Sequence, residues 1–212
     1  VNALVLNNNA TFKQIEIQFY ADTLIDIYGV SFDGDEGIYL DNFAMRGNSG
    51  LGLTSIPASI LSGFNSQLNY NLIVLQFGIN VSDAEMTDFS WYEKGMQRVV
   101  KHLQNAIPEA DILIVGVGDR SYKKDGEFIT QPSIPILVEA QREVAKKTNV
   151  AFWNLYQAMG GYNSMVEWVN ASKPLANKDY THVNANGAAK IANMLTNHIL
   201  NEFAKYEKNH AE

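Results

Sequence analysis

The sequence predicts an α/β protein, a three-layer α/β/α sandwich built around a mostly parallel sheet. Near-continuous apolar runs at Tyr70–Phe77 and Asp111–Val117 are typical of strands that are buried on both faces. Segments in which apolar residues recur at helical spacing follow these runs, over about 91–106 and 133–147. Strands that alternate with helices in this way form parallel sheets with helices packed on both faces.

The composition indicates a globular protein with one main domain. The chain has 212 residues, of which 46% are apolar and 18% charged. The net charge of −7 argues against a nucleic-acid partner and against binding to an anionic membrane surface. No apolar run approaches the roughly 18 residues that a membrane span needs, so we expect no membrane insertion. The absence of cysteine excludes disulfides, thiolate metal ligands and a cysteine nucleophile.

The first part of the chain has a β pattern. Apolar and polar residues alternate over Lys13–Tyr20, as in a half-buried strand. A second apolar run, Leu24–Phe32, follows after the short connection Ala21-Asp22. The short connection predicts an antiparallel hairpin. We therefore expect a β-rich segment over residues 1–36, preceding an α/β domain over residues 37–212.

Within the α/β domain, each expected element follows from its own pattern. Ile38–Met45 is expected to form a strand that leads into a glycine-rich loop. The last helix is expected over about Ala185–Ala204, with apolar side chains at helical spacing and lysines near its C-terminal end. The other expected elements are a helix over about Thr54–Gln67 and a short strand at Val150–Leu155.

An acid and a histidine lie three residues apart just before the last helix, in Asp179-Tyr180-Thr181-His182. The carboxylate can hold one imidazole nitrogen while the other nitrogen faces a substrate or a nucleophile. A surface loop produces the same spacing by chance, so this pair gains meaning only from other residues nearby. In parallel α/β sheets those residues lie in loops at the carboxyl ends of strands.

Two such loops carry further candidates. Gly78-Ile79-Asn80 follows the strand ending at Phe77, and an asparagine amide there can donate a hydrogen bond to a developing oxyanion. Gly47 lies in the glycine-rich loop after Met45, where free backbone N–H groups can bind an anion. An ordinary turn asparagine and a flexible connection are the alternative interpretations of the two loops.

In this order, Gly47, Asn80, Asp179 and His182 resemble the motifs of the SGNH (GDSL-type) hydrolase family. The resemblance covers about residues 38–204. Met159-Gly160-Gly161, followed by Trp168 and then by the Asp179–His182 motif, is similar to the branch that includes peptidoglycan O-acetylesterases. The family usually has an acidic residue after the asparagine, whereas this chain has Val81 there.

The resemblance implies a serine esterase that removes acyl groups, chiefly O-acetyl, from a carbohydrate or peptidoglycan. It assigns His182 and Asp179 to a catalytic triad and Gly47 and Asn80 to the oxyanion hole. It also implies no cofactor and no metal, an acylated glycan or small ester as substrate, and a periplasmic or secreted location.

The family's Gly-Asp-Ser motif, which supplies the nucleophile, does not occur in this sequence. Ser31 precedes Gly47 but lies in an apolar run, and Ser49 lies in the glycine-rich loop but follows Gly47. We expect both serines to have structural roles. The alternative interpretation is that Ser49 substitutes as the nucleophile. Because some members carry a β-rich insertion after the serine motif, we expect the motif and the first strand to lie upstream of Val1. The incomplete sheet could then support self-association.

Several other residues are weaker candidates for a site, and two other functions compete with the esterase. Both His102 and His198 fall in predicted helices without a second ligand at metal spacing. The loop from Arg120 to Asp125 could form a substrate rim. Four aromatic residues could either line a carbohydrate surface or pack in the core: Trp153, Tyr156, Tyr162 and Trp168. The competing functions are a catalytically inactive glycan-binding module and a flavodoxin-like nucleotide or flavin binder. The second lacks a phosphate-binding motif.

Overall fold

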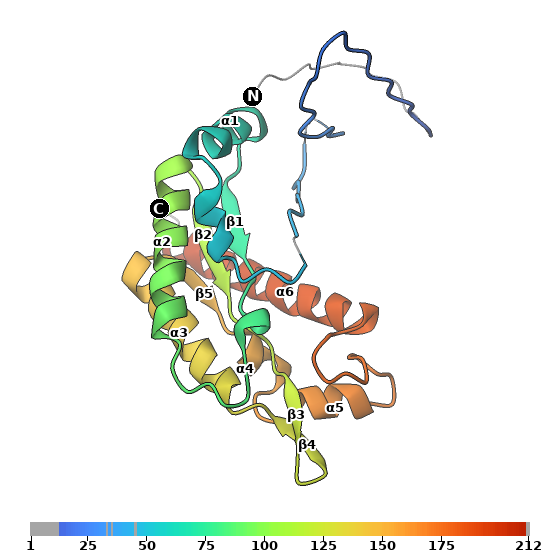
Figure 1. Ribbon diagram of the computed structural model, residues 1–212, viewed down its shortest axis with the longest axis vertical. Helices are drawn as coiled ribbons and strands as arrows, with labels where there is room; N and C mark the ends of the chain where they lie inside the picture. Colours follow the sequence, from blue (N-terminus) through green and yellow to red (C-terminus); the bar gives the residue numbers. More distant parts are fainter. Residues whose placement is uncertain (1–12, 33, 35, 45, 211–212) are drawn as a thin grey trace. The chain divides into compact units, whose positions relative to one another are not determined.

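The computed structural model describes residues 13–32, 34, 36–44 and 46–210, which are coloured along the sequence in Figure 1. They fall into two compact units, one within Asn2–Arg46 and the other within Gly47–Glu212. The expected boundary was after residue 36.

The first unit contains no helix and no strand among its described residues. The hairpin expected over residues 13–32 therefore does not form, and residues 38–44 of the strand expected at 38–45 are not in a strand. The alternating side chains Ile15, Ile17 and Phe19 are about half exposed. Alternation specifies a strand only where one face is buried against a partner, and an isolated hairpin is marginally stable at best. Residues 13–20 thus have the alternation of a strand, but their apolar side chains are not buried.

The second unit is built on a parallel three-stranded sheet, which confirms the predicted fold class. The strands are β1 (Leu72–Leu75), β2 (Asp111–Val115) and β5 (Ala151–Trp153), in the spatial order β1-β2-β5. In register, Val74 lies opposite Leu113, and Leu113 lies opposite Ala151. Among the described strands, β1 pairs with β2 alone.

Helices cover both faces of this sheet, which gives the three layers. One face packs on α1 (Ala58–Leu68), α2 (Ser90–Ala106) and α3 (Ser133–Thr148). The other face packs on α4 (Leu155–Met159), α5 (Ser164–Asn170) and α6 (Ala185–His210). Alternate β2 residues take part in the two cores. Ile112 and Ile114 belong to the first, and Leu113 and Val115 to the second. The continuous apolar run of β2 therefore contributes buried side chains to the cores on both faces of the sheet.

Two antiparallel strands, β3 (Ser121–Lys124) and β4 (Glu127–Thr130), form a hairpin where the sequence predicted only a polar loop. The turn residues Asp125 and Gly126 both have positive φ, 50° and 91°. Asp-Gly is the favoured pair for a two-residue hairpin turn of this kind. The dipeptide was the signal that could have predicted the hairpin. Short 3-10 helices also occur at Leu51–Ser55 (η1) and Ile79–Val81 (η2).

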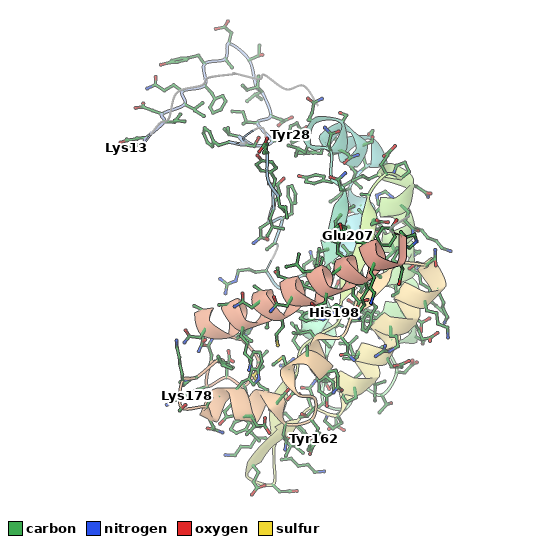
Figure 2. The ribbon with its side chains drawn as sticks, turned by 180° about the vertical axis from the view of Figure 1, so that it is seen from behind. Lys13, Tyr28, Tyr162, Lys178, His198 and Glu207 are labelled. Carbon is green, nitrogen blue, oxygen red and sulfur yellow. The ribbon has the colours of Figure 1, made fainter. Side chains whose placement is uncertain are left out.

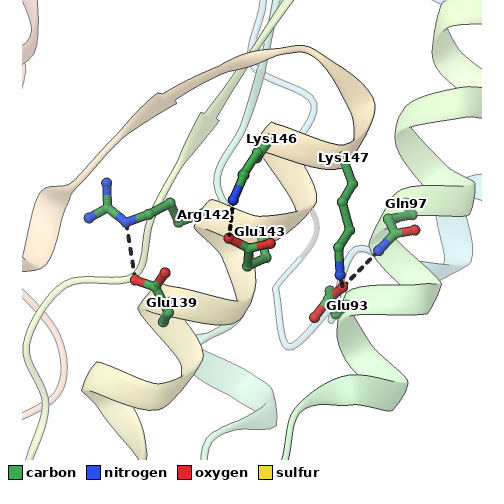
Figure 3. A network of polar contacts seen from close by, with 7 residues as sticks. All are labelled: Glu93, Gln97, Glu139, Arg142, Glu143, Lys146 and Lys147. Carbon is green, nitrogen blue, oxygen red and sulfur yellow. Dashed lines mark hydrogen bonds and ion pairs between the residues drawn. The ribbon is translucent and has the colours of Figure 1, made fainter.

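A surface network of polar contacts connects α2 to α3 (Figure 3). Lys147 lies 2.6 Å from Glu93, which also accepts a hydrogen bond from Gln97. The hydrogen bond to Glu93 raises the pKa of the Lys147 amine. Exposed ion pairs of this kind add little stability, so the buried apolar contacts of α2 and α3 dominate their packing. No helix in the described part of the chain is long and apolar enough to cross a membrane.

The start of α6 packs closely on the loop that precedes it, at Gly187. A Cβ on Gly187 would lie 2.0 Å from the carbonyl oxygen of Leu175, which accepts the backbone N–H of Asn184. Gly187→Ala should therefore lower the free energy of unfolding by about 1–3 kcal/mol, because backbone must move to admit the methyl group. Urea unfolding followed by circular dichroism measures this.

Gly52→Ala is the matched control, since its Cβ would meet nothing closer than Asn48 Nδ2 at 4.0 Å. The control should stay within about 0.5 kcal/mol of the wild type. Equal stability of the two variants would contradict the close contact at Gly187.

Candidate functional site

The loop between α5 and α6 brings Asp179 and His182 together. His182 Nδ1 lies 2.8 Å from Asp179 Oδ2, and Asp179 Oδ1 accepts the backbone N–H groups of Thr181 and His182, each at 3.0 Å. Both side chains are open to solvent, with 49% of Asp179 and 68% of His182 exposed. Figure 2 labels Lys178, the residue before Asp179, near the N-terminal end of α6, with His198 farther along the helix.

Electrostatics fixes the roles of the two nitrogens of His182. Burial would raise the pKa of the Asp179 carboxyl, but hydrogen bonds from His182 and Thr181 outweigh it and hold the pKa below its usual value. The carboxylate is therefore ionised at neutral pH, and Nδ1–H donates to it. Nε2 of a neutral imidazole is then the proton acceptor.

The loops that carry Gly47 and Asn80 also meet. Asn80 Nδ2 donates to the carbonyl oxygen of Asn48 at 3.3 Å, and the buried Tyr92 hydroxyl donates to the carbonyl oxygen of Ser49 at 3.2 Å. Burial raises the pKa of the Tyr92 hydroxyl well above its usual range, so it remains a donor. Gly47 and Asn80 themselves are exposed. The second amide hydrogen of Asn80 is available to an incoming oxygen.

Gly78 and Gln141 set the position of this asparagine. Gly78 has φ 118°, and a Cβ there would lie 2.8 Å from Gln141 Nε2. The buried Gln141 side chain donates to the carbonyl oxygen of Phe77 and accepts the backbone N–H of Val117. It thereby joins β1 and β2 just beyond their last paired residues. Sequence reasoning missed Gln141, because a glutamine in a helical pattern carries no sign of this contact.

The segment that continues from β2 connects the two halves of the site. Arg120 Nη1 donates to the Ser82 hydroxyl at 3.0 Å and to the carbonyl oxygens of Ser82 and Ile79 at 3.3 and 3.4 Å. The next residue, Ser121, donates its backbone N–H to the carbonyl oxygen of Tyr180 at 2.9 Å. Adjacent residues thus contact the loop of Asn80 and the loop of His182. Arg120 was expected only as part of a substrate rim.

Hydrogen bonds to the buried side chain of Asp119 fix the position of the segment that carries Arg120 and Ser121. Its side chain is 1% exposed and accepts hydrogen bonds from the Thr130 hydroxyl at 2.8 Å and the Met165 backbone N–H at 2.8 Å. The Ser164 hydroxyl also donates to it, at 3.4 Å. Burial raises the pKa of the Asp119 carboxyl, and these hydrogen bonds oppose the rise. Its place just after β2 was the signal in the sequence that could have found it.

No serine side chain takes the nucleophile's place in the described residues of the second unit. His182 makes its side-chain hydrogen bond to Asp179, and no serine hydroxyl there bonds to it. Ser49 Oγ accepts the backbone N–H of Leu51 at 3.3 Å, a local turn contact. Ser31 belongs to the other unit.

The histidine and tryptophan candidates lie outside this constellation. His102 Nε2 contacts the carbonyl oxygen of Ile56 at 2.8 Å, a structural contact, and His198 is exposed on α6. Trp153 of β5 and Trp168 of α5 are buried in the same core, which favours packing over carbohydrate stacking. Tyr162 is exposed.

Comparison with known proteins identifies the family to which this chain is related. Residues 18–190 match the family described as GDSL-like lipase/acylhydrolase. The structure is similar to a peptidoglycan O-acetylesterase at 26% identity and TM-score 0.64, covering 76% of this chain and 45% of that chain. It is also similar in fold to an acetyl xylan esterase at 21% identity and TM-score 0.51, covering 73% and 78%. No curated protein matches the chain.

The chain thus spans less than half of the length of that peptidoglycan O-acetylesterase. The family match covers most of the second unit, including the loops of Gly47, Asn80, Asp179 and His182. The chain belongs to the GDSL-like lipase/acylhydrolase family.

Proposed function

We propose that this chain is the acylhydrolase portion of a serine esterase that removes O-acetyl groups from peptidoglycan or another carbohydrate. The observation that carries the proposal is the hydrogen bond between Asp179 and His182, which leaves Nε2 as a proton acceptor. The similarity to a peptidoglycan O-acetylesterase supports the choice of substrate class. Because such polymers lie outside the cytoplasm, we place the protein in the periplasm or outside the cell.

The proposed mechanism is acyl transfer in two steps. A serine hydroxyl attacks the acyl carbonyl carbon while His182 Nε2 takes its proton, and Asp179 stabilises the imidazolium. The Gly47 backbone N–H and the Asn80 amide donate to the oxyanion of the tetrahedral intermediate. His182 then protonates the departing sugar oxygen as the carbon–oxygen bond breaks. Water, deprotonated by His182, hydrolyses the acyl-enzyme and regenerates the serine.

The serine in this proposal lies outside residues 47–210. The edge of β1 supports this, because among the described strands β1 pairs with β2 alone. On one face of β1, Leu72 and Val74 are also 45% and 42% exposed, so that face is only partly covered. We propose that a serine-bearing strand, the first strand of the complete sheet, pairs with this edge. Its carboxyl end would then lie beside the loop of Asn80. Without that strand the same edge could pair with a second copy of the chain.

A glycan-binding module without catalysis is the second candidate. It is favoured by the absence of a serine hydroxyl on His182 in the described part of the second unit. The two candidates differ in their dependence on the imidazole. Binding to O-acetylated peptidoglycan that survives His182→Ala, in a full-length protein without esterase activity, would favour the binding module.

This chain alone should not hydrolyse p-nitrophenyl acetate above the rate of a His182→Ala variant, since the covalent route needs the missing serine. Release of p-nitrophenolate at 405 nm measures the rate. Turnover that is abolished by Ser49→Ala would contradict the expectation and assign Ser49 as the nucleophile.

In the full-length protein, Asn80→Ala should lower kcat by about 10²–10³-fold with little change in KM, because the amide binds the oxyanion rather than the ground-state ester. His182→Ala should lower kcat further. Acetate release from O-acetylated peptidoglycan provides the assay. His198→Ala, an exposed histidine on α6, is the matched control and should retain full activity. An Asn80→Ala variant with wild-type kcat would remove this residue from the oxyanion hole.

A further inference from the structure

Tyr180, between Asp179 and His182, has an unfavourable backbone conformation. Its φ is +55°, in the left-handed region that favours glycine and tolerates asparagine and aspartate. The other described non-glycine residues with positive φ are all of those tolerant types: Asn69, Asp125, Asn149 and Asn163. A bulky aromatic residue at such a position persists only where its surroundings over-determine it.

Three contacts hold Tyr180 in this conformation. Its backbone N–H donates to the carbonyl oxygen of Asn177 at 3.1 Å, and its own carbonyl oxygen accepts the N–H of Ser121 at 2.9 Å. Its ring stacks on Phe128 of β4, with centroids 3.7 Å apart and planes inclined by 8°. The two hydrogen bonds use backbone atoms that any residue would supply. The stack depends on the side chain, which also packs against the core formed by residues such as Trp168 and Met165.

Phe128 belongs to a hairpin that is itself firmly attached. It lies opposite Lys123 in the β3–β4 ladder. At the end of β4, Thr130 donates its hydroxyl to the buried Asp119 and its backbone N–H to the side chain of Asn163. A ring stacked on Phe128 is therefore attached to the core of the second unit through the hairpin.

We propose that Tyr180 and Phe128 are positioning residues, whose stacked rings hold the Asp179–His182 loop in the conformation that aims Nδ1 at the carboxylate. The catalytic meaning of this position rests on the function proposed above. Glycine would suit the backbone of residue 180 better, but glycine could not make the stack on Phe128. Both the stack and the strained φ lie within two residues of the imidazole, which makes His182 the group that they position.

The tautomer of His182 tests this directly on the chain itself. At a pH well above the imidazole titration range, donation to Asp179 favours the Nδ1–H form. The imidazole ¹⁵N chemical shifts, read by long-range ¹H–¹⁵N correlation spectra, report the ratio of the two tautomers. A His182→Ala spectrum assigns the signals among the four histidines.

Tyr180→Gly relieves the backbone strain and removes the ring, and should lower the ratio of Nδ1–H to Nε2–H by about threefold or more. Tyr180→Phe keeps the stack and should retain the wild-type ratio. Phe128→Leu removes the stacking partner without altering the sequence of the loop, and should lower the ratio of Nδ1–H to Nε2–H by a similar factor. It therefore tests the stack even if Tyr180→Gly does not fold. Asn149→Gly, at a position with the same φ of 55° on the C-terminal cap of α3, is the control and should leave the ratio unchanged.

A wild-type tautomer ratio in folded Phe128→Leu or Tyr180→Gly would overturn the proposal. A ratio of Nδ1–H to Nε2–H that falls in Tyr180→Phe would overturn it as well. The readout does not require turnover. Absence of esterase activity in the full-length protein would therefore reject the proposed function, while the tautomer ratio would still decide the positioning role.

Discussion

The buried carboxylate of Asp119 is the contact on which the arrangement of the site depends. It receives hydrogen bonds from the β3–β4 hairpin through Thr130 and from the start of α5 through Met165. A buried ionised group is costly unless it is fully hydrogen-bonded, so these partners must converge on it in the folded chain. Their convergence fixes the course of the chain just after β2. The two residues that follow, Arg120 and Ser121, then reach the loops that carry Asn80 and His182.

In this arrangement the side chains of the candidate site are exposed, and the groups that position them are buried. The carboxylate and imidazole of Asp179 and His182 remain open to solvent, as does Asn80, while the groups that hold them are partly or fully buried. The proposed hydrolase site needs this separation, because a substrate must reach the imidazole and the proposed oxyanion donors without disturbing their geometry. Buried Gln141 and Tyr92 serve the Asn80 side in the same way, through carbonyl oxygens at Phe77 and Ser49.

The sheet edge beside β1 sets a second constraint. Among the described strands β1 pairs with β2 alone, so its other edge is a template for another strand, and Leu72 and Val74 on one of its faces are partly exposed. The C-terminal half of α6 adds apolar side chains that are also exposed: Ile199, Leu200, Phe203 and Tyr206. Completion of the sheet by a serine-bearing strand would cover part of this surface and supply the nucleophile at once. The stability and the activity of the protein would then depend on the same pairing.

The sequence by itself determined the parallel α/β core and the pairing of Asp179 with His182, because both follow from local patterns. Buried strands such as Asp111–Val115 show as apolar runs, and a carboxylate three residues before a histidine can reach its imidazole within one loop. Tertiary structure decided the rest. The alternation over residues 13–20 predicted a strand, but a strand needs a partner that no local pattern can supply. The roles of Asp119, Arg120 and the stack of Tyr180 on Phe128 depend on contacts between segments far apart in sequence, which only the folded chain brings together.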